Sequence, residues 1–129
     1  MKLLLDTHIM LWWALGNEQL SKTARTFISD ERNECVVSVV SVWEIAIKCR
    51  LGRGLPADVT AHRYLQLIDE AGFLLKEVRK AHALGVELID GIHGDTFDRM
   101  IVAQAQVEGF KLLTHDKALG SYGDFVILV

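Results

Sequence analysis

Four acidic residues that are far apart in the chain could act together on a metal ion: Asp6, Glu44, Asp98 and Asp116. Two unit negative charges about 4 Å apart repel each other by about 4 kcal/mol at an effective dielectric constant near 20. Carboxylates that share one place must therefore be protonated, paired with basic groups or bridged by a cation, and oxygen ligands favour Mg²⁺ or Mn²⁺. Because such an ion can activate a water molecule and stabilise a leaving oxygen at phosphorus, the predicted chemistry is phosphodiester hydrolysis.

The elements that must position these acids alternate between short apolar strands and helices. The predicted strands are residues 2–6, 35–39, 73–78, 111–114 and 125–129. The predicted helices are residues 7–15, 21–30, 41–51, 58–71, 79–86 and 95–108, with a turn at 90–94. Strands that are apolar on both faces and separated by helices indicate a mainly parallel sheet covered on both sides. The predicted fold class is therefore α/β, in a single domain of residues 1–129.

This arrangement brings the acids to one edge of the sheet. Asp6 ends the first predicted strand, and Asp116 follows the strand 111–114. Ligands of an open parallel sheet bind beyond the carboxyl ends of its strands, so both acids are expected at the same edge. Glu44 and Asp98 are placed in the first turns of helices that begin at this edge.

Each of these two helical acids shares a helix face with apolar residues. The apolar partners of Glu44 on its face are Val40, Ile47 and Leu51, and those of Asp98 are Ile101, Val102 and Ala105. A carboxylate beside an apolar stripe points toward protein and needs a partner there.

Helix capping is the structural alternative for the helical acids. Ser41 and Glu44 fit the S-x-x-E capping box, and Asp95 and Asp98 resemble it. Asp95 could simply be the N-cap of its helix.

Helix capping explains one of the two acids that follow strands better than the other. Asp116 could cap the short turn before Ala118. Asp6 is harder to explain in this way, because aspartate is depleted in strands and no obvious helix needs a cap beyond Thr7.

Composition limits where the protein works and what it binds. Half of the residues are hydrophobic, and the first apolar run ends at Asp6, too early for a secretory signal. No segment reaches the ~18 apolar residues of a membrane span. Cys35 and Cys49 lack a metal-binding spacing and are expected to be reduced thiols in a soluble, cytoplasmic protein. The net charge of −3 does not favour nucleic-acid binding, so RNA binding would need a local basic rim.

Four segments resemble, in order and over the whole chain, the motifs of PIN-domain proteins, most closely VapC-type toxins of bacterial toxin–antitoxin pairs. These segments are LLLDTH at 3–8, SVWEIAIK at 41–48, HGDTFDRMI at 93–101 and LLTHD at 112–116. The resemblance implies an α/β/α sandwich that cleaves RNA with Mg²⁺ or Mn²⁺. It also implies a homodimer and a cognate antitoxin that occludes the site.

The resemblance assigns site residues by position. The family's four acids fall on Asp6, Glu44, Asp98 and Asp116, with Thr114 as a neighbouring polar residue. A further acid, Asp95, matches one in the subgroup with His-x-Asp-Pro-Phe-Asp-Arg, and it is an additional candidate ligand.

This sequence departs from that subgroup at Thr96, where proline is usual. Proline at the first helical position only pre-sets the entry to the helix, so the change should not disable the site.

Several other residues could contact RNA or the metal. Lys48, Arg50 and Arg53 could hold RNA phosphates, as could Arg99 and Thr114. The alternative for Lys48 is an i,i+4 pair with Glu44 on a solvated face, worth a few tenths of a kcal/mol.

Histidine and tryptophan residues near the acids leave two roles open. His8, His93 and His115 lack an HxxH spacing, and supporting or surface roles are favoured over metal ligation. Trp12 and Trp13 could stack on bases or belong to the core or an interface.

The predicted function is an endoribonuclease in which the acids position one or two Mg²⁺ ions. A haloacid-dehalogenase-like phosphatase would need Asp-x-Asp, but position 8 is His8, and a response-regulator receiver would need an acid where Leu5 stands. The alternatives are a catalytically silent PIN-like binding or scaffold protein, or another Mg²⁺-dependent phosphatase with acids at the edge of its sheet.

Overall fold

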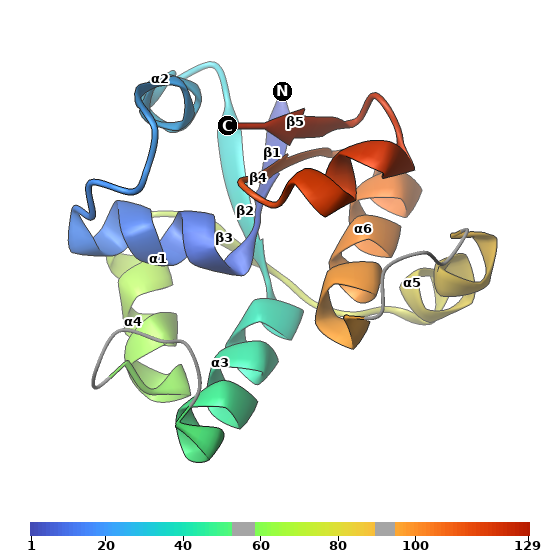
Figure 1. Ribbon diagram of the computed structural model, residues 1–129, viewed down its shortest axis with the longest axis horizontal. Helices are drawn as coiled ribbons and strands as arrows, with labels where there is room; N and C mark the ends of the chain where they lie inside the picture. Colours follow the sequence, from blue (N-terminus) through green and yellow to red (C-terminus); the bar gives the residue numbers. More distant parts are fainter. Residues whose placement is uncertain (53–58, 90–94) are drawn as a thin grey trace.

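In the part of the chain that the structure describes, five parallel strands form one central sheet (Figure 1). The structure is a computed structural model that describes residues 1–52, 59–89 and 95–129. The strands are β1 (Lys2–Leu5), β2 (Glu34–Ser38), β3 (Leu74–Lys76), β4 (Lys111–Thr114) and β5 (Val126–Leu128). They lie in the order β3-β2-β1-β4-β5, and each neighbouring pair is parallel. The predicted parallel sheet is confirmed, and each strand lies within two residues of its predicted ends.

Helices connect the strands close to the predicted positions. They are α1 (Thr7–Leu15), α2 (Lys22–Ser29), α3 (Val39–Leu51), α4 (Ala61–Glu70), α5 (Lys80–Gly85) and α6 (Thr96–Glu108). Two 3₁₀ helices were not predicted as elements, η1 (Val86–Leu88) and η2 (Lys117–Tyr122). Within the described ranges, no helix is long and apolar enough to span a membrane.

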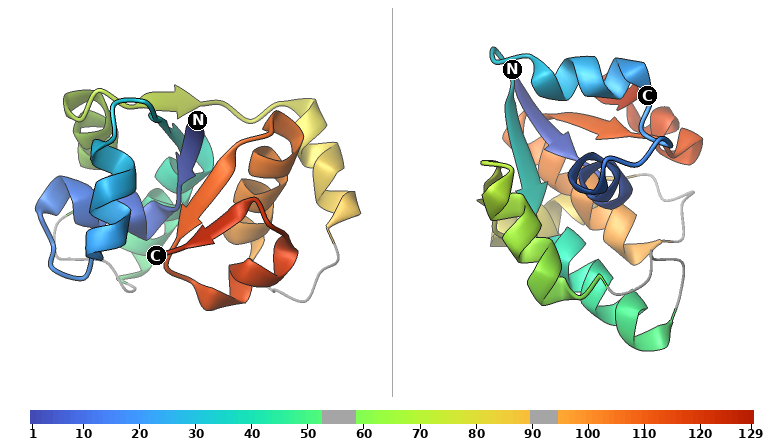
Figure 2. Two further views of the ribbon diagram at one scale, coloured as in Figure 1. Left: turned by 90° about the horizontal axis from the view of Figure 1, so that it is seen from above. Right: turned by 90° about the vertical axis from the view of Figure 1, so that its left-hand side faces the viewer.

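Hydrophobic clusters cover both faces of the sheet. Successive side chains of a strand point to opposite faces, and β1 accordingly sends Leu3 and Leu5 into one cluster and Leu4 into the other. The first cluster contains buried residues of α1, α2 and α4, and the second contains those of α6. Figures 1 and 2 show these helices on opposite sides of the sheet. The predicted three-layer α/β/α arrangement is confirmed.

The central position of β1 decides where a site can form. The chain extends the sheet from β1 to β2 and β3 on one side, and then adds β4 and β5 on the other. Leu5 pairs with Leu113, so the carboxyl ends of β1 and β4 lie side by side. Ligands of parallel sheets bind where the connections leave in opposite directions from neighbouring strands.

Helix α3 begins earlier than predicted. Its N-cap is Ser38, whose hydroxyl accepts a hydrogen bond from the N–H of Val40 at 3.0 Å. The capping box predicted at Ser41 is therefore wrong, because the β2 strand already ends at Ser38 and the helix continues directly from it. Glu44 lies in the second turn of α3 and not in the first.

The predicted apolar stripes differ in how far they enter the core. The three apolar residues that share a face with Asp98 are fully buried. On the face of Glu44, Val40 is buried, but Ile47 and Leu51 are 41% and 58% exposed. The second half of α3 therefore presents apolar side chains to the surface.

A buried polar pair joins the two helices on either side of the site. Gln104 on α6 is fully buried and accepts a hydrogen bond from the hydroxyl of Ser38 at the start of α3. The amide of Gln104 also donates to the carbonyl of Glu77 at 3.3 Å. This pair fixes the start of α3 against the middle of α6.

Some predictions fall at element ends or outside the described residues. Helix α4 begins at Ala61, with Thr60 as its N-cap, three residues later than predicted. The turn at 90–94, which contains His93, and residue Arg53 lie outside the described residues. Cys35 is buried and Cys49 is exposed, and both carry free thiols as expected.

Candidate active site

The predicted acids lie around one pocket at the carboxyl end of the sheet. The pocket has a volume of about 330 Å³ and is lined by Asp6, His8, Trp12, Glu44, Lys48, Asp95, Asp98, His115 and Asp116. The prediction that Asp6 and Asp116 meet at one edge is confirmed, since both line this pocket. The fold therefore brings together acids from four separate segments of the chain.

Asp6 is held at the end of β1 by two hydrogen bonds. The hydroxyl of Thr114 donates to Asp6 Oδ2 at 2.6 Å, and the N–H of Thr7 donates to Asp6 Oδ1 at 2.7 Å. Asp6 is only 8% exposed. Burial raises the pKa of Asp6, the two hydrogen bonds oppose this rise, and the charge of Glu44 adds to it. The carboxylate of Asp6 is thus fixed in place, and a cation bound near it would favour its charged form.

The expectation that Asp6 caps no helix was wrong. Asp6 is the N-cap of α1, and its side chain accepts from the N–H of Thr7. Because β1 passes directly into α1, one residue both ends the strand and begins the helix. Capping and a place in the pocket are therefore compatible for this acid.

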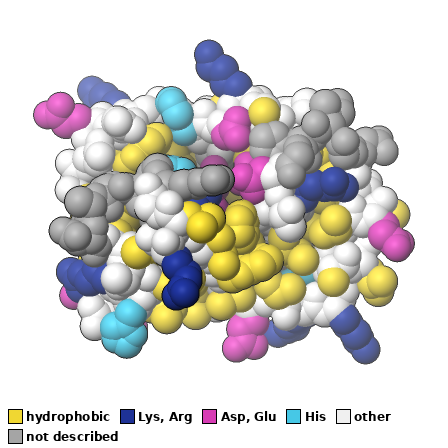
Figure 3. Space-filling view, turned by 60° about the horizontal axis from the view of Figure 1, so that its bottom comes forward, with side chains coloured by type: hydrophobic (Ala, Val, Ile, Leu, Met, Phe, Trp, Pro, Cys, Tyr) yellow, Lys and Arg dark blue, Asp and Glu magenta, His cyan; other side chains and the backbone are white. Residues whose placement is uncertain are grey.

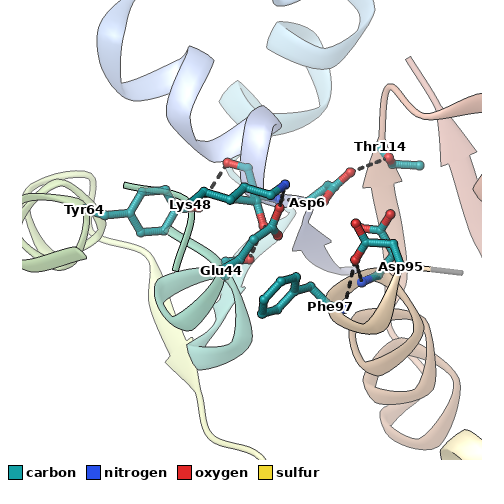
Figure 4. Close-up of polar contacts among 10 residues, drawn as sticks. Asp6, Glu44, Lys48, Tyr64, Asp95, Phe97 and Thr114 are labelled. Atoms are coloured by element: carbon teal, nitrogen blue, oxygen red, sulfur yellow. Dashed lines mark hydrogen bonds and ion pairs between the residues drawn. The ribbon is translucent and has the colours of Figure 1, made fainter. Parts of the chain in front are cut away.

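Thr7 connects the two buried acids. Its hydroxyl donates to Glu44 Oε1 at 2.7 Å, while its N–H donates to Asp6. The Thr7 hydroxyl is also hydrogen-bonded to that of Ser41 at 2.8 Å, and the Thr7 carbonyl accepts from the Tyr64 hydroxyl at 3.1 Å. Glu44 is 3% exposed. Thr7 thus supports the positions of both carboxylates, those of Asp6 and Glu44, which are labelled in Figure 4.

Thr7, Ser41 and Tyr64 were missed as parts of the site by sequence reasoning. Thr7 follows Asp6 directly, and Ser41 lies three residues before Glu44, on the same face of α3. These spacings were available signals. Tyr64 carried none, because only the packing of α4 against the site brings its hydroxyl to Thr7.

The acids of α6 are organised by capping. Asp95 is the N-cap, and Asp95 Oδ1 accepts from the N–H groups of Phe97 at 2.9 Å and Asp98 at 3.1 Å. This capping role for Asp95 was predicted and is confirmed. Asp98 lies in the first turn, partly buried, and also lines the pocket.

The acid that follows β4, Asp116, is also organised by capping. Asp116 Oδ1 accepts from the N–H of Ala118 at 3.0 Å and caps η2. The structural alternative considered for Asp116, a cap before Ala118, is therefore present, and Asp116 lines the pocket as well. The N–H of Asp116 donates to the hydroxyl of Thr114 at 3.1 Å. Thr114 is fully buried, which leaves it no exposed surface for the predicted RNA contact. Its hydroxyl instead links Asp6 to the Asp116 segment.

Comparison with known proteins identifies the family. The PIN-domain family model matches residues 3–124. The chain belongs to the PIN-domain family. Ribonuclease VapC22 from Mycobacterium tuberculosis is 29% identical over 119 residues, which cover 92% of this chain and 90% of that protein. The predicted resemblance to VapC-type PIN domains is confirmed.

Solved structures show the same fold at low sequence identity. VapBC2 from Rickettsia felis, bound to a DNA fragment from its promoter, has a TM-score of 0.65 and 13% identity, covering 100% of this chain and 98% of that one. A toxin–antitoxin complex from Klebsiella pneumoniae has a TM-score of 0.65 and 15% identity, covering 96% and 94%. FitAcB from Neisseria gonorrhoeae has a TM-score of 0.60 and 17% identity, covering 98% and 96%.

Lys48 brings a positive charge into the pocket of this PIN domain. Its ammonium forms an ion pair with Glu44 Oε2, one helical turn away. Partial burial lowers the pKa of Lys48, but the hydrogen bond to Glu44 and the charges of Asp95 and Asp98 together raise it above the ordinary value. The predicted i,i+4 pair is confirmed, but it lies in the pocket and not on a solvated face.

The other predicted cations lie elsewhere. In the described part of the chain, the pocket lining includes neither Arg50, which is exposed, nor Arg99, which is partly buried on α6. The lining that the structure describes therefore does not form the expected basic rim of this PIN domain.

Aromatic rings form one wall of the pocket. Trp12 lies 5.9 Å from the ring of His8 and 5.4 Å from that of His115, measured between ring centroids. Trp13 instead contacts Phe73 at 6.3 Å, beside the core of the PIN domain. The structure thus separates the two tryptophans, and only Trp12 lines the pocket.

The donor chemistry of the pocket fits a hard divalent cation. Five carboxylates line it, and carboxylate oxygens are the ligands that Mg²⁺ and Mn²⁺ prefer. Among residues 1–52, 59–89 and 95–129, however, no three acidic, histidine or cysteine side chains already form a metal-binding group. The acids of this PIN domain surround a space and do not converge on one point.

Proposed function

We propose that this PIN domain is a Mg²⁺- or Mn²⁺-dependent endoribonuclease, the toxin of a type II toxin–antitoxin pair. The observation that carries the proposal is the single pocket lined by Asp6, Glu44, Asp98 and Asp116. The relative from Mycobacterium tuberculosis is named a ribonuclease, and the structural neighbour from Klebsiella pneumoniae is a toxin–antitoxin complex.

The four acids would hold the metal, with Asp95 as an additional candidate ligand. When bound, the metal supplies an activated water molecule and stabilises negative charge at the scissile phosphodiester. Asp6 and Glu44 offer carboxylates whose orientation is already fixed by Thr7. Fixed ligands favour catalysis because little reorganisation is needed when the substrate arrives.

The substrate would lie across the pocket mouth. Lys48 offers an ammonium for a phosphate oxygen of the RNA. Arg50, Arg53 and Arg99 remain candidates for contacts with phosphates farther along the RNA strand. Trp12 offers an aromatic ring on which an unpaired base could stack, an interaction worth about 1–3 kcal/mol per base. An unpaired base implies single-stranded RNA at the cleavage site.

Protein partners would use the apolar surface near the pocket. Trp43, Ile47 and Leu51 on α3 are 51%, 41% and 58% exposed. Figure 3 shows hydrophobic side chains gathered beside acidic ones on the face that contains α3. Exposed apolar patches of this kind are typical of protein interfaces. We propose a cognate antitoxin and a second copy of the chain as the partners.

The test is cleavage of single-stranded RNA by the purified protein in Mg²⁺ or Mn²⁺. Cleavage should stop with EDTA. It should fall by more than about a hundredfold in Asp6→Asn, since even hydrogen-bonded neighbours of metal ligands usually contribute ten- to a hundredfold. Asp30→Asn is the matched control, because Asp30 pairs with Arg32 outside this pocket.

Two results would contradict the proposal. One is cleavage by Asp6→Asn at the wild-type rate, and the other is wild-type cleavage that persists in EDTA. Mn²⁺ binding without cleavage of any RNA would instead support the catalytically silent binding protein.

A further inference from the structure

We propose that Lys48 is an internal counter-ion that occupies the acidic pocket until a divalent cation displaces its ammonium from Glu44. The inference rests on the proposed metal site and adds a step to it, namely that metal binding must exchange one cation for another. The released ammonium is then available to a phosphate oxygen of the substrate.

The position of Lys48 is the first observation. Lys48 and Glu44 occupy consecutive turns of α3, and the lysine side chain reaches back along the helix to the carboxylate (Figure 4). The Lys48 side chain is 27% exposed, whereas that of Glu44 is 4% exposed. Asp95 and Asp98 line the same pocket from α6. The ammonium is therefore paired with Glu44 in a pocket that also carries the negative charges of two further acids.

The occupancy of the Glu44 oxygens is the second observation. Oε1 accepts the Thr7 hydroxyl at 2.7 Å, and Oε2 accepts the Lys48 ammonium. Because Oε1 already accepts the buried Thr7 hydroxyl, Oε2 is the oxygen more available to a ligand in the pocket. The ammonium of Lys48 already occupies it.

Electrostatics makes the two cations competitors. A dication bound by Glu44 Oε2 would stand within a few ångströms of the Lys48 ammonium, where like charges repel strongly. The acids also explain why the ammonium stays in the pocket when no metal is bound. Carboxylates that line one pocket repel one another, and the ammonium reduces that repulsion. One side chain therefore stabilises the metal-free pocket and weakens its metal affinity.

The lysine side chain is suited to moving between these positions. A lysine side chain carries its compact ammonium charge on a flexible four-carbon stem. The partial exposure of Lys48 leaves this stem a path toward solvent. A displaced ammonium would remain at the pocket, where the RNA backbone is proposed to lie. Metal binding and phosphate binding would then support each other.

Replacing Lys48 separates this role from an ordinary helix pair. In Lys48→Met, Mn²⁺ affinity measured by calorimetry without RNA should rise about tenfold, because both the competitor and the repulsion are gone. The unfolding midpoint of the metal-free protein should fall, and its increase on adding Mn²⁺ should grow. Lys48→Arg, which keeps the charge, should resemble wild type.

Arg50→Met is the matched control on the same helix. It removes the same charge from an exposed residue that does not line the pocket. Because the calorimetry contains no RNA, the proposed contact of Arg50 with the substrate does not enter, and the Mn²⁺ affinity of Arg50→Met should change less than about twofold at physiological salt. Lys48→Gln serves as a second variant if Lys48→Met does not fold, as judged by circular dichroism.

The outcomes distinguish this inference from the proposed function. If wild type binds Mn²⁺ and neither Lys48→Met nor Lys48→Gln binds it more tightly than Arg50→Met, the counter-ion role is overturned while the metal site stands. If neither wild type nor the Lys48 variants bind Mn²⁺, the metal site itself is overturned, and the inference with it.

Discussion

The two sides of the pocket are built in different ways. On one side, Asp6 and Glu44 are 8% and 3% exposed and accept hydrogen bonds from hydroxyl groups of other segments, although Asp6 also caps α1. On the other side, Asp95 and Asp116 are partly buried and are held by backbone N–H groups two or three residues further along the chain. We call these the buried side and the capping side.

This difference shows how one pocket can combine tertiary and local structure. Long-range hydrogen bonds fix the acids of the buried side, so their geometry depends on the whole fold. Caps form wherever a helix begins, so the capping side is made by short segments. Substitutions should therefore couple function to stability on the buried side and allow the two to be separated on the capping side.

Among substitutions of residues that support the acids, the largest expected effect is that of Thr7→Val on the buried side. It removes the hydroxyl that donates to Glu44 Oε1, and an unsatisfied buried acceptor costs about 1–3 kcal/mol of unfolding free energy. RNA cleavage should fall about ten- to a hundredfold because a proposed ligand loses its orientation. Denaturant unfolding and a cleavage assay measure the two effects. Thr7→Ser keeps the hydroxyl, so it should retain most of the wild-type stability and most of the wild-type cleavage.

The next effect tests the capping side at Asp95. Asp95→Ala should reduce the unfolding free energy by about 1 kcal/mol, as the loss of an N-cap usually does. Asp95→Ser can still cap α6, so it should recover this stability. If Asp95 also serves the metal, cleavage by Asp95→Ser should stay low. If Asp95→Ser recovered both the unfolding free energy and the cleavage rate, Asp95 would serve only as a helix cap.

A smaller effect is expected for Tyr64→Phe, which reaches the buried side from α4. The substitution removes the hydrogen bond to the Thr7 carbonyl, worth about 0.5–1.5 kcal/mol. Cleavage should fall less than in Thr7→Val, since the carboxylates keep their own donors. An equal or larger loss in Tyr64→Phe would indicate that the position of the Thr7 backbone, and not its hydroxyl, controls the site.

The smallest effect is predicted for Asp30→Asn, far from either side of the pocket. Hydrogen bonds from Arg32 lower the pKa of Asp30 from 3.8 to about 2. A lowered pKa means that the pair stabilises the folded state above about pH 4 and that this contribution is lost as the pH falls through about 2. The variant should therefore be slightly less stable than wild type at neutral pH, and the difference should disappear as the pH falls below about 2. Thermal unfolding across this range checks the prediction, and RNA cleavage should not change.

Most of the fold was predictable because hydrophobic patterning and helix ends are local signals. Helix α1 has the predicted ends, and Gly52 and Gly109 close α3 and α6 with positive φ angles of 65° and 73°. The start of α3 was misplaced because two serines could each have been its cap. The tertiary contact of Ser38 with Gln104 was invisible in the sequence.

The site was predictable in its acids but not in their supports. Acidic residues after strands share an edge by topology alone, which is why Asp6 and Asp116 were paired correctly. The hydroxyl groups of Thr7 and Tyr64 gain their roles only from side-chain packing across elements. Lys48 was ambiguous for a related reason, because i,i+4 spacing does not show whether a helix face meets water or a pocket.

The hydrogen bond between Ser38 and Gln104 has a consequence for how the pocket can change shape. It ties α3 to α6 beneath the site, while the apolar second half of α3 extends toward solvent. The rings of Trp43 on α3 and Phe97 on α6 also meet, 4.7 Å apart between their centroids. Separating the two helices would therefore break both contacts, so together they oppose any widening of the pocket.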